Sequence, residues 1–288
     1  MNPDEIAVSV VIPCFNDGRF LLEAVQSAEK NQRGRHELVI VNDGSNDRAT
    51  LDLLSAIEQR GHRVVHQNNR GLGSARNRGI SAARGRYILP LDADNRIRPA
   101  YIDRGIEILD HEPGIAVVYG DLEYFGVATG RKRIPEFNLR NLLAGNYIDA
   151  CTVFRKNAWE RCGGYDEKMP IQGYEDWDLW CRIALSGGGF HHVDEVLYDY
   201  RVRKDSMSSG MLIPARLAAI FHHMRAKGIE VTMDGYLDAR QSWDFLAERF
   251  PGRSPGVLMG LMVRAYLRGW YSKIKNRIHV RIHARHDS

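Results

Sequence analysis

The chain has 288 residues, of which 44% are hydrophobic and 26% are charged, and its mean hydropathy is −0.38. These values are ordinary for a soluble globular protein and exclude disordered, collagen-like and membrane-spanning classes. The net charge of +4 is unevenly spread, because residues 261–288 contain seven Lys or Arg and a single acid. That segment carries +6 and leaves −2 on residues 1–260. A basic nucleic-acid-binding face on the body of the protein is therefore not expected.

The cysteines and the first residues bear on the compartment. The chain has four cysteines, Cys14, Cys151, Cys162 and Cys181. They form no C-x-x-C pair and no zinc-ligand spacing, so we expect reduced, buried thiols. Asp4 and Glu5 stand where a signal peptide would be positively charged, and the apolar residues 257–263 are too short to cross a bilayer. The sequence predicts a cytoplasmic protein.

Short apolar runs alternate with amphipathic stretches in the N-terminal half, which is typical of βα units on a parallel sheet. The first run, Val8–Pro13, is nearly all apolar, as expected of a strand buried on both faces. Asp47 is placed to cap the helix that follows the second strand. The expected strands are 8–13, 37–41, 64–65, 87–91 and 115–119, and the expected helices are 20–30, 49–59, 74–83 and 99–109.

The alternation changes after residue 120. Residues 121–140 combine charge with strand-forming residues and predict a hairpin or a loop excursion. Further strands are expected at 150–154 and 190–200, with a helix at 175–185 between them. From about residue 211 the pattern is helical, with a break at Pro251 to Pro255. We therefore expect an α/β domain over residues 1–208 and a C-terminal helical region over 209–288.

Polar residues follow each of the first four predicted strands, where a parallel sheet binds its ligands. Asn and Asp favour turns in any protein, so one such loop would carry no information. Four in succession indicate a ligand that is held by side chains. These residues are Asn16, Asp17, Asn42, Asp43, Asn68, Asn69, Asp92 and Asp94.

The first of these turns lacks a glycine-rich phosphate cradle. It reads Pro13-Cys14-Phe15-Asn16-Asp17-Gly18, whereas a dinucleotide fold would show G-x-G-x-x-G, and no P-loop pattern occurs elsewhere. The pair Gly71 and Gly73 opens a predicted helix and is explained by a tight turn more simply than by an anion site. Nicotinamide and P-loop chemistry are disfavoured.

Asp92-Ala93-Asp94 is the most specific short motif. Two carboxylates that flank a small residue at the end of a strand can turn toward one hard cation, and Mg²⁺ or Mn²⁺ suits such oxygen ligands together with substrate phosphates. D-x-D patterns also arise by chance. The position between an apolar strand and a proline-led helix distinguishes this one.

Seven motifs over residues 8–208 resemble, in order and spacing, the GT-A glycosyltransferases of family 2. They are Ser9–Asn16, Val39–Ser45, Asn69–Gly79, Asp92–Asn95, Gly163–Asp166, Gly173–Leu179 and Tyr200–Ser206. The resemblance implies a Rossmann-like, mostly parallel sheet flanked by helices. It also implies transfer of a sugar from a nucleoside diphosphate, with inversion at the anomeric carbon and a divalent cation, Mn²⁺ or Mg²⁺, as cofactor.

The resemblance also assigns a donor site. Pro13, Phe15, Asn16 and Asp43 would line the nucleoside pocket, and Asp43 would accept a hydrogen bond from a pyrimidine imide. Arg76 would lie on the base or phosphate side. Asp92 would face the ribose or a metal-bound water, with Ala93 beside it, and Asp94 would bind the metal and diphosphate. Arg201, in the last motif, would also bind the nucleotide sugar.

Arg203 departs from the family pattern, because many members carry histidine there. An arginine is always protonated and does not ligate a cation, but it can bind a diphosphate directly. This difference leaves a third protein ligand for the metal open and suggests weaker metal dependence. His191 and His192 lie close in sequence and are better read as histidines on a strand surface.

Inversion requires one base opposite the leaving group, to take the proton of the acceptor hydroxyl. Asp176 is the candidate and Glu175 the alternative, both at the start of a predicted helix, where acids are common in any protein. Trp177 is left open between stacking on an acceptor sugar and packing. Trp180 lies on an apolar face and is expected in the core.

The C-terminal segment 261–285 has apolar residues at spacings of three and four with basic residues between them, which suits an anionic membrane surface. A helix packed on the body is the competing interpretation.

The leading hypothesis is a glycosyltransferase that acts in surface polysaccharide synthesis. It would use a nucleotide sugar, with UDP the expected nucleotide, and a glycan or lipid-linked acceptor. Its expected location is cytoplasmic or peripheral at the plasma membrane. Rivals are a non-catalytic nucleotide-sugar-binding subunit and, less favoured, a sugar nucleotidyltransferase. The oligomeric state is open, and no nucleic acid is expected as partner.

Overall fold

A computed structural model describes residues 6–30, 36–204, 220 and 222–229. The chain divides into two compact units, residues 1–229 and 230–288. The whole second unit, and with it the predicted basic tail, lies outside the described residues, as does most of the helical pattern expected after residue 211. The boundary expected at residue 208 stays a prediction.

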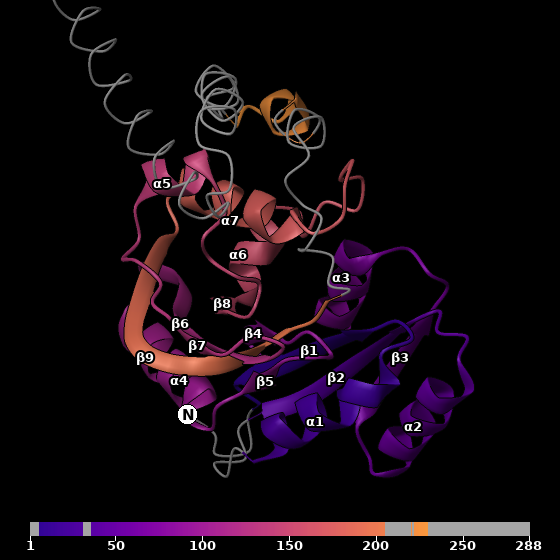
Figure 1. The fold of residues 1–288 in the computed structure, drawn as a ribbon. Coiled ribbons are helices and arrows are strands. Elements are labelled where there is room, and N and C mark those ends of the chain that lie inside the picture. The colour runs from indigo at the N-terminus through magenta and orange to yellow at the C-terminus, as the bar shows by residue number, and fades with distance from the viewer. Residues whose placement is uncertain (1–5, 31–35, 205–219, 221, 230–288) are drawn as a thin grey trace, which may run out of the picture. The chain divides into compact units, whose positions relative to one another are not determined.

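The first unit is built on a mixed sheet (Figure 1). Its strands in the described part of the chain are β1 (Val8–Cys14), β2 (His36–Asp43), β3 (Arg63–Gln67), β4 (Tyr87–Pro90), β5 (Arg96–Ile97), β6 (Ile115–Gly126), β7 (Gly130–Lys132), β8 (Val153–Arg155) and β9 (Gly189–Val202). The order across the sheet is β3-β2-β1-β4-β8-β6-β9-β5, and β7 pairs with β6. β3, β2, β1 and β4 are parallel, as are β6 and β9, whereas β8 runs antiparallel between β4 and β6.

Helices cover both faces of this sheet. They are α1 (Gly18–Glu29), α2 (Arg48–Gln59), α3 (Leu72–Ala82), α4 (Ala100–His111), α5 (Leu139–Ala144), α6 (Lys156–Arg161) and α7 (Glu175–Leu185). In Figure 1, α1 and α2 lie on one side of the strands and α3 on the other. Asp47 caps α2 as predicted, since its Oδ1 accepts a 2.8 Å hydrogen bond from the Thr50 amide. No helix in the described part is long and apolar enough to cross a membrane.

The predicted elements of the N-terminal half are confirmed with small shifts of their ends, and the expected hairpin after residue 120 is the β6–β7 pair. β6 is longer than expected, because it continues to Gly126 alongside β9. The strand expected at 150–154 begins only at Val153. Three short elements, β5, α5 and α6, were not predicted, since two to six residues carry too little periodicity to reveal a strand or helix.

Close packing of α3 on the sheet places the start of that helix at the edge where the strands end. A Cβ on Gly79 would lie 2.4 Å from Val11 Cγ1 and 2.8 Å from Val41 Cγ2. Glycine therefore lets the helix backbone approach β1 and β2. All seven residues of β1 are buried, in keeping with its apolar sequence.

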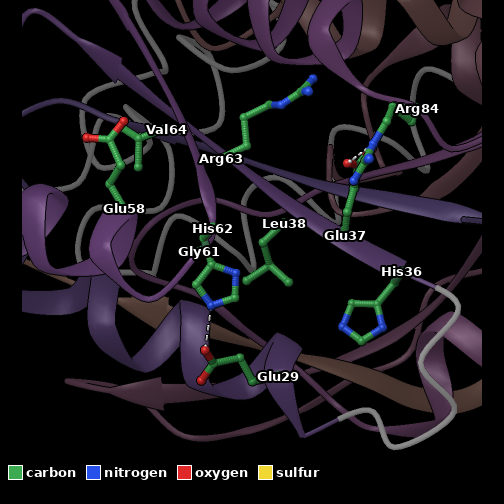
Figure 2. Close-up of a pocket in the computed structure, with 10 residues that line it drawn as sticks. All are labelled: Glu29, His36, Glu37, Leu38, Glu58, Gly61, His62, Arg63, Val64 and Arg84. Atoms are coloured by element: carbon green, nitrogen blue, oxygen red, sulfur yellow. Dashed lines mark hydrogen bonds and ion pairs between the residues drawn. The ribbon is translucent and has the colours of Figure 1, made fainter.

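A polar cavity of about 630 Å³ lies at the opposite end of the strands (Figure 2). Its walls come from the beginnings of β2 and β3, the ends of α1 and α2 and the segment before β4: Glu29, His36, Glu37, Leu38, Glu58, Gly61, His62, Arg63, Val64 and Arg84. A 2.7 Å hydrogen bond between His62 and Glu29 and a 2.8 Å ion pair between Arg84 and Glu37 link residues of its walls. It shares no residue with the site predicted from the sequence.

Candidate active site

The loops after β1 and β2 are joined by one side chain. Asn16 has a positive φ of 54°, and its Oδ1 accepts hydrogen bonds from the amides of Asn46 (2.8 Å) and Asp47 (3.2 Å). Its Nδ2 donates to Asn46 Oδ1 at 2.8 Å. Phe15 beside it is 46% exposed, while Pro13 is buried in β1. Asn16 thus fixes the loop that presents the Phe15 ring to solvent.

Asp43, the last residue of β2, organises the segment that leads into α3. Its Oδ1 accepts from Gln67 Nε2 (2.7 Å) and the Arg70 amide (2.9 Å), and its Oδ2 accepts from the Gly71 amide (3.0 Å). The residue is only 4% exposed. The carboxylate is therefore held in a fixed direction at the end of the strand.

The Asp92-Ala93-Asp94 segment follows β4 and is anchored by the end of β9. The Arg201 amide donates to Asn95 Oδ1 at 2.9 Å, and Arg201 Nε donates to the Asp94 carbonyl at 3.0 Å. Arg201 Nη2 also donates to Glu23 at 2.8 Å. The structure thus places Arg201 behind the D-x-D segment, where its side chain holds the main chain of that segment.

Asp94 is influenced by two neighbouring carboxylates and one guanidinium. Burial, and next the neighbouring charge of Asp92, raise the pKa of Asp94 to about 6, and Asp17 adds to this effect. Arg203 opposes it, with its Nε atom 3.4 Å from Asp94 Oδ2. Arg203 Nη1 also donates to Asp17 Oδ1 at 2.9 Å. A further positive charge at this point would relieve the repulsion between the carboxylates.

Arg76 is buried between two carboxylates. Its Nη2 donates to Asp92 Oδ1 at 2.7 Å and its Nη1 to Glu175 Oε1 at 2.6 Å, and the residue is only 2% exposed. The guanidinium also lies 5.6 Å from the centre of the Tyr165 ring. Arg76 therefore lies behind the carboxylates of the site, enclosed by them and by Tyr165.

Asp176 follows Glu175 in the first turn of α7, and its carboxylate is nearly buried at 8% exposure. It accepts hydrogen bonds from Asn146 Nδ2 (3.0 Å) and its neighbour's amide, Trp177 N (2.7 Å). Burial, and next the charge of Glu175, raise the pKa of Asp176 well above its usual range, and Arg76 opposes this shift. A carboxylate with a raised pKa is a better proton acceptor than an ordinary one.

Asp149 joins this cluster although the sequence analysis missed it. It is half-buried in the segment before β8, where its Oδ1 accepts from the Cys151 amide at 2.9 Å. Burial, and next the charge of Asp92, raise its pKa to about 6. An isolated aspartate between apolar residues, in no recognised motif, gave no signal that would have identified it.

The two tryptophans of α7 pack inside the protein. Trp180 is fully buried, as expected of a core residue. Trp177 is 2% exposed, and its Nε1 donates to the Leu142 carbonyl of α5 at 2.5 Å. Of the two roles left open for Trp177, the structure supports packing.

A side-chain amide fastens the segment after α6 to α3. Asn77 Nδ2 donates to the Tyr165 carbonyl (2.8 Å) and to Glu167 Oε1 (3.1 Å). Its Oδ1 accepts from Trp159 Nε1 (3.1 Å) and the Tyr165 amide (2.8 Å). The segment that leads toward α7 is thereby held against the helix that carries Arg76.

The donor set fits a hard cation that shares its coordination with a substrate. Asp92 and Asp94 offer carboxylate oxygens, and Mg²⁺ characteristically takes one or two carboxylates together with substrate phosphates. Burial, and next the charge of Asp92, raise the pKa of Asp94, and a cation bound between the two carboxylates would offset the second of these effects. Over residues 6–30, 36–204, 220 and 222–229, no group of three or more His, Cys, Asp or Glu side chains could hold a metal by itself.

Comparison with solved structures identifies the fold. The chain is similar to TarS of S. aureus, solved as residues 1–349 with UDP-GlcNAc, with a TM-score of 0.66 and 17% identity over 82% of this chain and 72% of that one. The TarS structure with UDP has a TM-score of 0.63 at 17% identity, over 85% of this chain and 72% of that one.

Curated relatives are longer than this chain. It is 28% identical to a chondroitin synthase of Pasteurella multocida over 70% of its length, which is 21% of that protein. A chondroitin synthase of Escherichia coli is 27% identical over 67% of the chain, or 28% of the relative. The chain thus spans between about a fifth and under a third of these proteins.

Family models match most of the described domain. Residues 137–205 match a model described as the N-terminal domain of galactosyltransferase. Residues 9–163, more than half of the chain, match the model of glycosyl transferase family 2. The chain therefore belongs to glycosyl transferase family 2 and has the GT-A fold that its motifs imply.

Proposed function

We propose that this glycosyltransferase moves a sugar from a nucleoside diphosphate to a hydroxyl group of a glycan or lipid-linked acceptor, with inversion, in the synthesis of a surface polysaccharide. The relatives that are named chondroitin synthases support a polysaccharide product. The single observation that carries the proposal is that buried Arg76 joins Asp92 of the D-x-D segment to Glu175, the residue before Asp176, at one end of the sheet.

The donor would lie across the ends of β1, β2 and β4. The exposed ring of Phe15 offers a stacking surface for a base, and Asp43, at the end of the neighbouring strand β2, is a carboxylate in a fixed direction. UDP is the expected nucleotide, a choice supported by TarS, whose structures contain UDP-GlcNAc and UDP. The diphosphate would lie near Asp94 and Arg203, where an arginine can donate charge-assisted hydrogen bonds to phosphate oxygens.

Asp94, with Asp92, would hold Mn²⁺ or Mg²⁺. A divalent cation would act there as a Lewis acid that stabilises the charge developing on the departing diphosphate. Arg203 would add a second, permanent positive charge on the same side of the site. The requirement for metal is therefore expected to be partial.

Asp176 would be the base. The oxygen of the acceptor hydroxyl forms a bond to the anomeric carbon while the bond from that carbon to the diphosphate oxygen breaks. The hydroxyl proton passes to the Asp176 carboxylate, and the bonding electrons of the leaving group remain on the diphosphate. Because both events occur at one carbon from opposite faces, the configuration inverts.

The test is nucleotide release from a panel of UDP-, GDP- and dTDP-sugars with Mn²⁺ and candidate glycan acceptors. We expect turnover with one nucleotide class, and Asp176→Asn should lower it by about 100-fold or more, the usual contribution of a positioned base. Asp103→Asn is the matched control, because Asp103 also lies in the first turn of a helix, α4. Undiminished transfer in Asp176→Asn and Asp94→Asn would contradict the proposed roles. Nucleotide binding without turnover over any acceptor would favour the non-catalytic subunit instead.

Membrane contact through residues 261–285 is a separate part of the proposal and rests on their composition. Sedimentation with vesicles that contain anionic lipid should retain the full chain and release a chain truncated after residue 260. If the vesicles retain the full and truncated chains equally, the proposed membrane contact is wrong, while the proposed transfer reaction is unaffected.

A further inference from the structure

Both carboxylate oxygens of Glu175 form hydrogen bonds within the protein. Its Oε1 accepts from Arg76 at 2.6 Å and its Oε2 accepts from the Gly173 amide at 2.8 Å, and the residue is 1% exposed. Both carboxylate oxygens of Glu175 are thus occupied by donors of the protein itself. Glu175 is therefore poorly placed to exchange a proton with an acceptor, and it serves instead as an anchor at the start of α7.

The other end of this contact is the D-x-D segment. The second terminal nitrogen of Arg76 donates to Asp92 at 2.7 Å, so one guanidinium spans two segments that are far apart in the sequence. The planar fork of an arginine can hold two carboxylates in fixed relative positions, which the single ammonium of a lysine cannot do in the same way. The Arg76 side chain is enclosed, because it is 2% exposed and faces the Tyr165 ring.

Asp176 takes its position from this arrangement. It is the residue that follows Glu175, so the anchor fixes the first turn of α7 relative to the segment that carries Asp92 and Asp94. The charged groups that face Asp176 are Glu175 from its own helix, Arg76 from α3 and Asp149 from the segment before β8.

We propose that Arg76 is a positioning residue for the transfer reaction: by holding Glu175 and Asp92 on one guanidinium, it sets the placement of Asp176 relative to the donor segment. This role rests on the proposed function, and it replaces a direct contact between Arg76 and the donor. It makes a distinct prediction, because a residue that contacts the donor affects nucleotide binding, whereas a positioning residue affects turnover.

The experiment measures kcat, KM and UDP affinity for Arg76→Lys and Glu175→Gln in the full chain, with the nucleotide sugar that the wild type uses. In Arg76→Lys the charge remains and the double contact is lost. We expect kcat to fall about 100-fold, the usual effect of displacing a reacting group by about 1 Å, with KM and the Kd of UDP nearly unchanged.

The dependence of kcat on pH provides a readout that a purely structural role would not move. Asp176 must be ionised to accept a proton, so kcat rises as pH increases through its pKa. Glu175 raises that pKa. Glu175→Gln removes this charge while Arg76 remains, so the acid limb of the profile should move to lower pH. If Arg76→Lys does not fold, Glu175→Gln, which is neutral and nearly isosteric with the wild type, still tests the proposal.

Arg131→Lys is the matched control. Arg131, whose side chain is 37% exposed, pairs with the fully buried Asp121 at 2.6 Å, so the variant disturbs the partner of a buried carboxylate outside the site. It should change thermal stability without changing kcat or the pH profile.

The outcomes separate the two proposals. Wild-type protein that turns over no nucleotide sugar would overturn the proposed function, and the role of Arg76 with it. If the wild type turns over a nucleotide sugar but Arg76→Lys loses UDP affinity in parallel with kcat, only the positioning role is overturned. The positioning role is also overturned if Glu175→Gln keeps the wild-type kcat and the acid limb of its pH profile does not move.

Discussion

Arg203 approaches Asp94 through its Nε atom, at 3.4 Å from the carboxylate that the D-x-D motif would offer to a cation. The same guanidinium donates to Asp17 at 2.9 Å and lies 5.4 Å from the centre of the Phe20 ring. Its position is therefore fixed before any donor arrives. A permanent charge is thus built into the place where the diphosphate is expected.

Arg203→Gln is expected to weaken UDP binding by about tenfold or more, because a charge-assisted hydrogen bond contributes roughly 1.5–3 kcal/mol. Titration calorimetry at two salt concentrations would measure the loss, and the salt dependence of binding should decrease with it. Arg104→Gln is the control, since Arg104 forms an exposed ion pair with Glu195. Equal UDP affinity in wild type and Arg203→Gln would contradict the predicted contact.

Removal of divalent metal should lower UDP affinity without abolishing it. Two positive charges would act on the diphosphate, and a chelator removes only one of them. In Arg203→Gln the same treatment should abolish binding, and Arg203→His should increase the dependence on Mn²⁺ because a neutral imidazole can ligate it. UDP affinity that vanishes in wild type with chelator would show that Arg203 contributes no useful charge.

Asp47→Ala should lower the free energy of unfolding by about 1 kcal/mol, as expected for loss of an N-cap. Urea denaturation would measure the change. Asp52→Ala removes an acid from the exposed face of the same helix, where Arg48 and Asp52 are largely in solvent, and should cost less than about 0.5 kcal/mol. If the two variants lose equal free energy of unfolding, the N-cap hydrogen bond of Asp47 does not stabilise the helix.

Asp166 should make stability depend on acid pH. Burial acts to raise its pKa, but hydrogen bonds from Lys227 and His223 (2.6 Å) outweigh burial and hold the pKa well below its usual range. A depressed pKa stabilises the folded state fully above the unfolded value of about 4; this contribution begins to decrease below that value and is lost only as pH falls through the folded-state pKa. Wild type should therefore exceed Asp166→Asn in stability at pH 7, keep most of that advantage at pH 3.5, and lose it progressively at lower pH. Urea denaturation across this pH range tests the prediction, and an advantage that is already absent at pH 3.5 would contradict it.

Local signals in the sequence were sufficient for much of the fold. The apolar run that forms β1 and the turn residues after β2 are signals made by residues that are adjacent in the sequence. Helix α7 begins at Glu175 and ends at Leu185, as predicted. The D-x-D motif was recognisable for the same reason, since a strand end and two carboxylates are contiguous in the chain.

Relations between distant segments were not predictable. β5 exists only because Arg96 and Ile97 pair with Asp199 and Tyr198 of β9. The enclosure of Arg76 likewise depends on where α7 returns to the sheet, so a motif arginine expected near the nucleotide proved to be surrounded by carboxylates. Such placements follow from the assembled sheet rather than from any local pattern.

The amide of Asn77 uses its full donor capacity on one side and accepts two hydrogen bonds on the other. Its orientation is therefore dictated, because a rotated amide would point oxygen at the Tyr165 carbonyl and nitrogen at the Trp159 donor. A carboxylate of the same size cannot satisfy these partners, since it would place lone pairs against that carbonyl and against Glu167. Exchange of one nitrogen for one oxygen at Asn77 is thus expected to release the segment between α6 and α7 from α3.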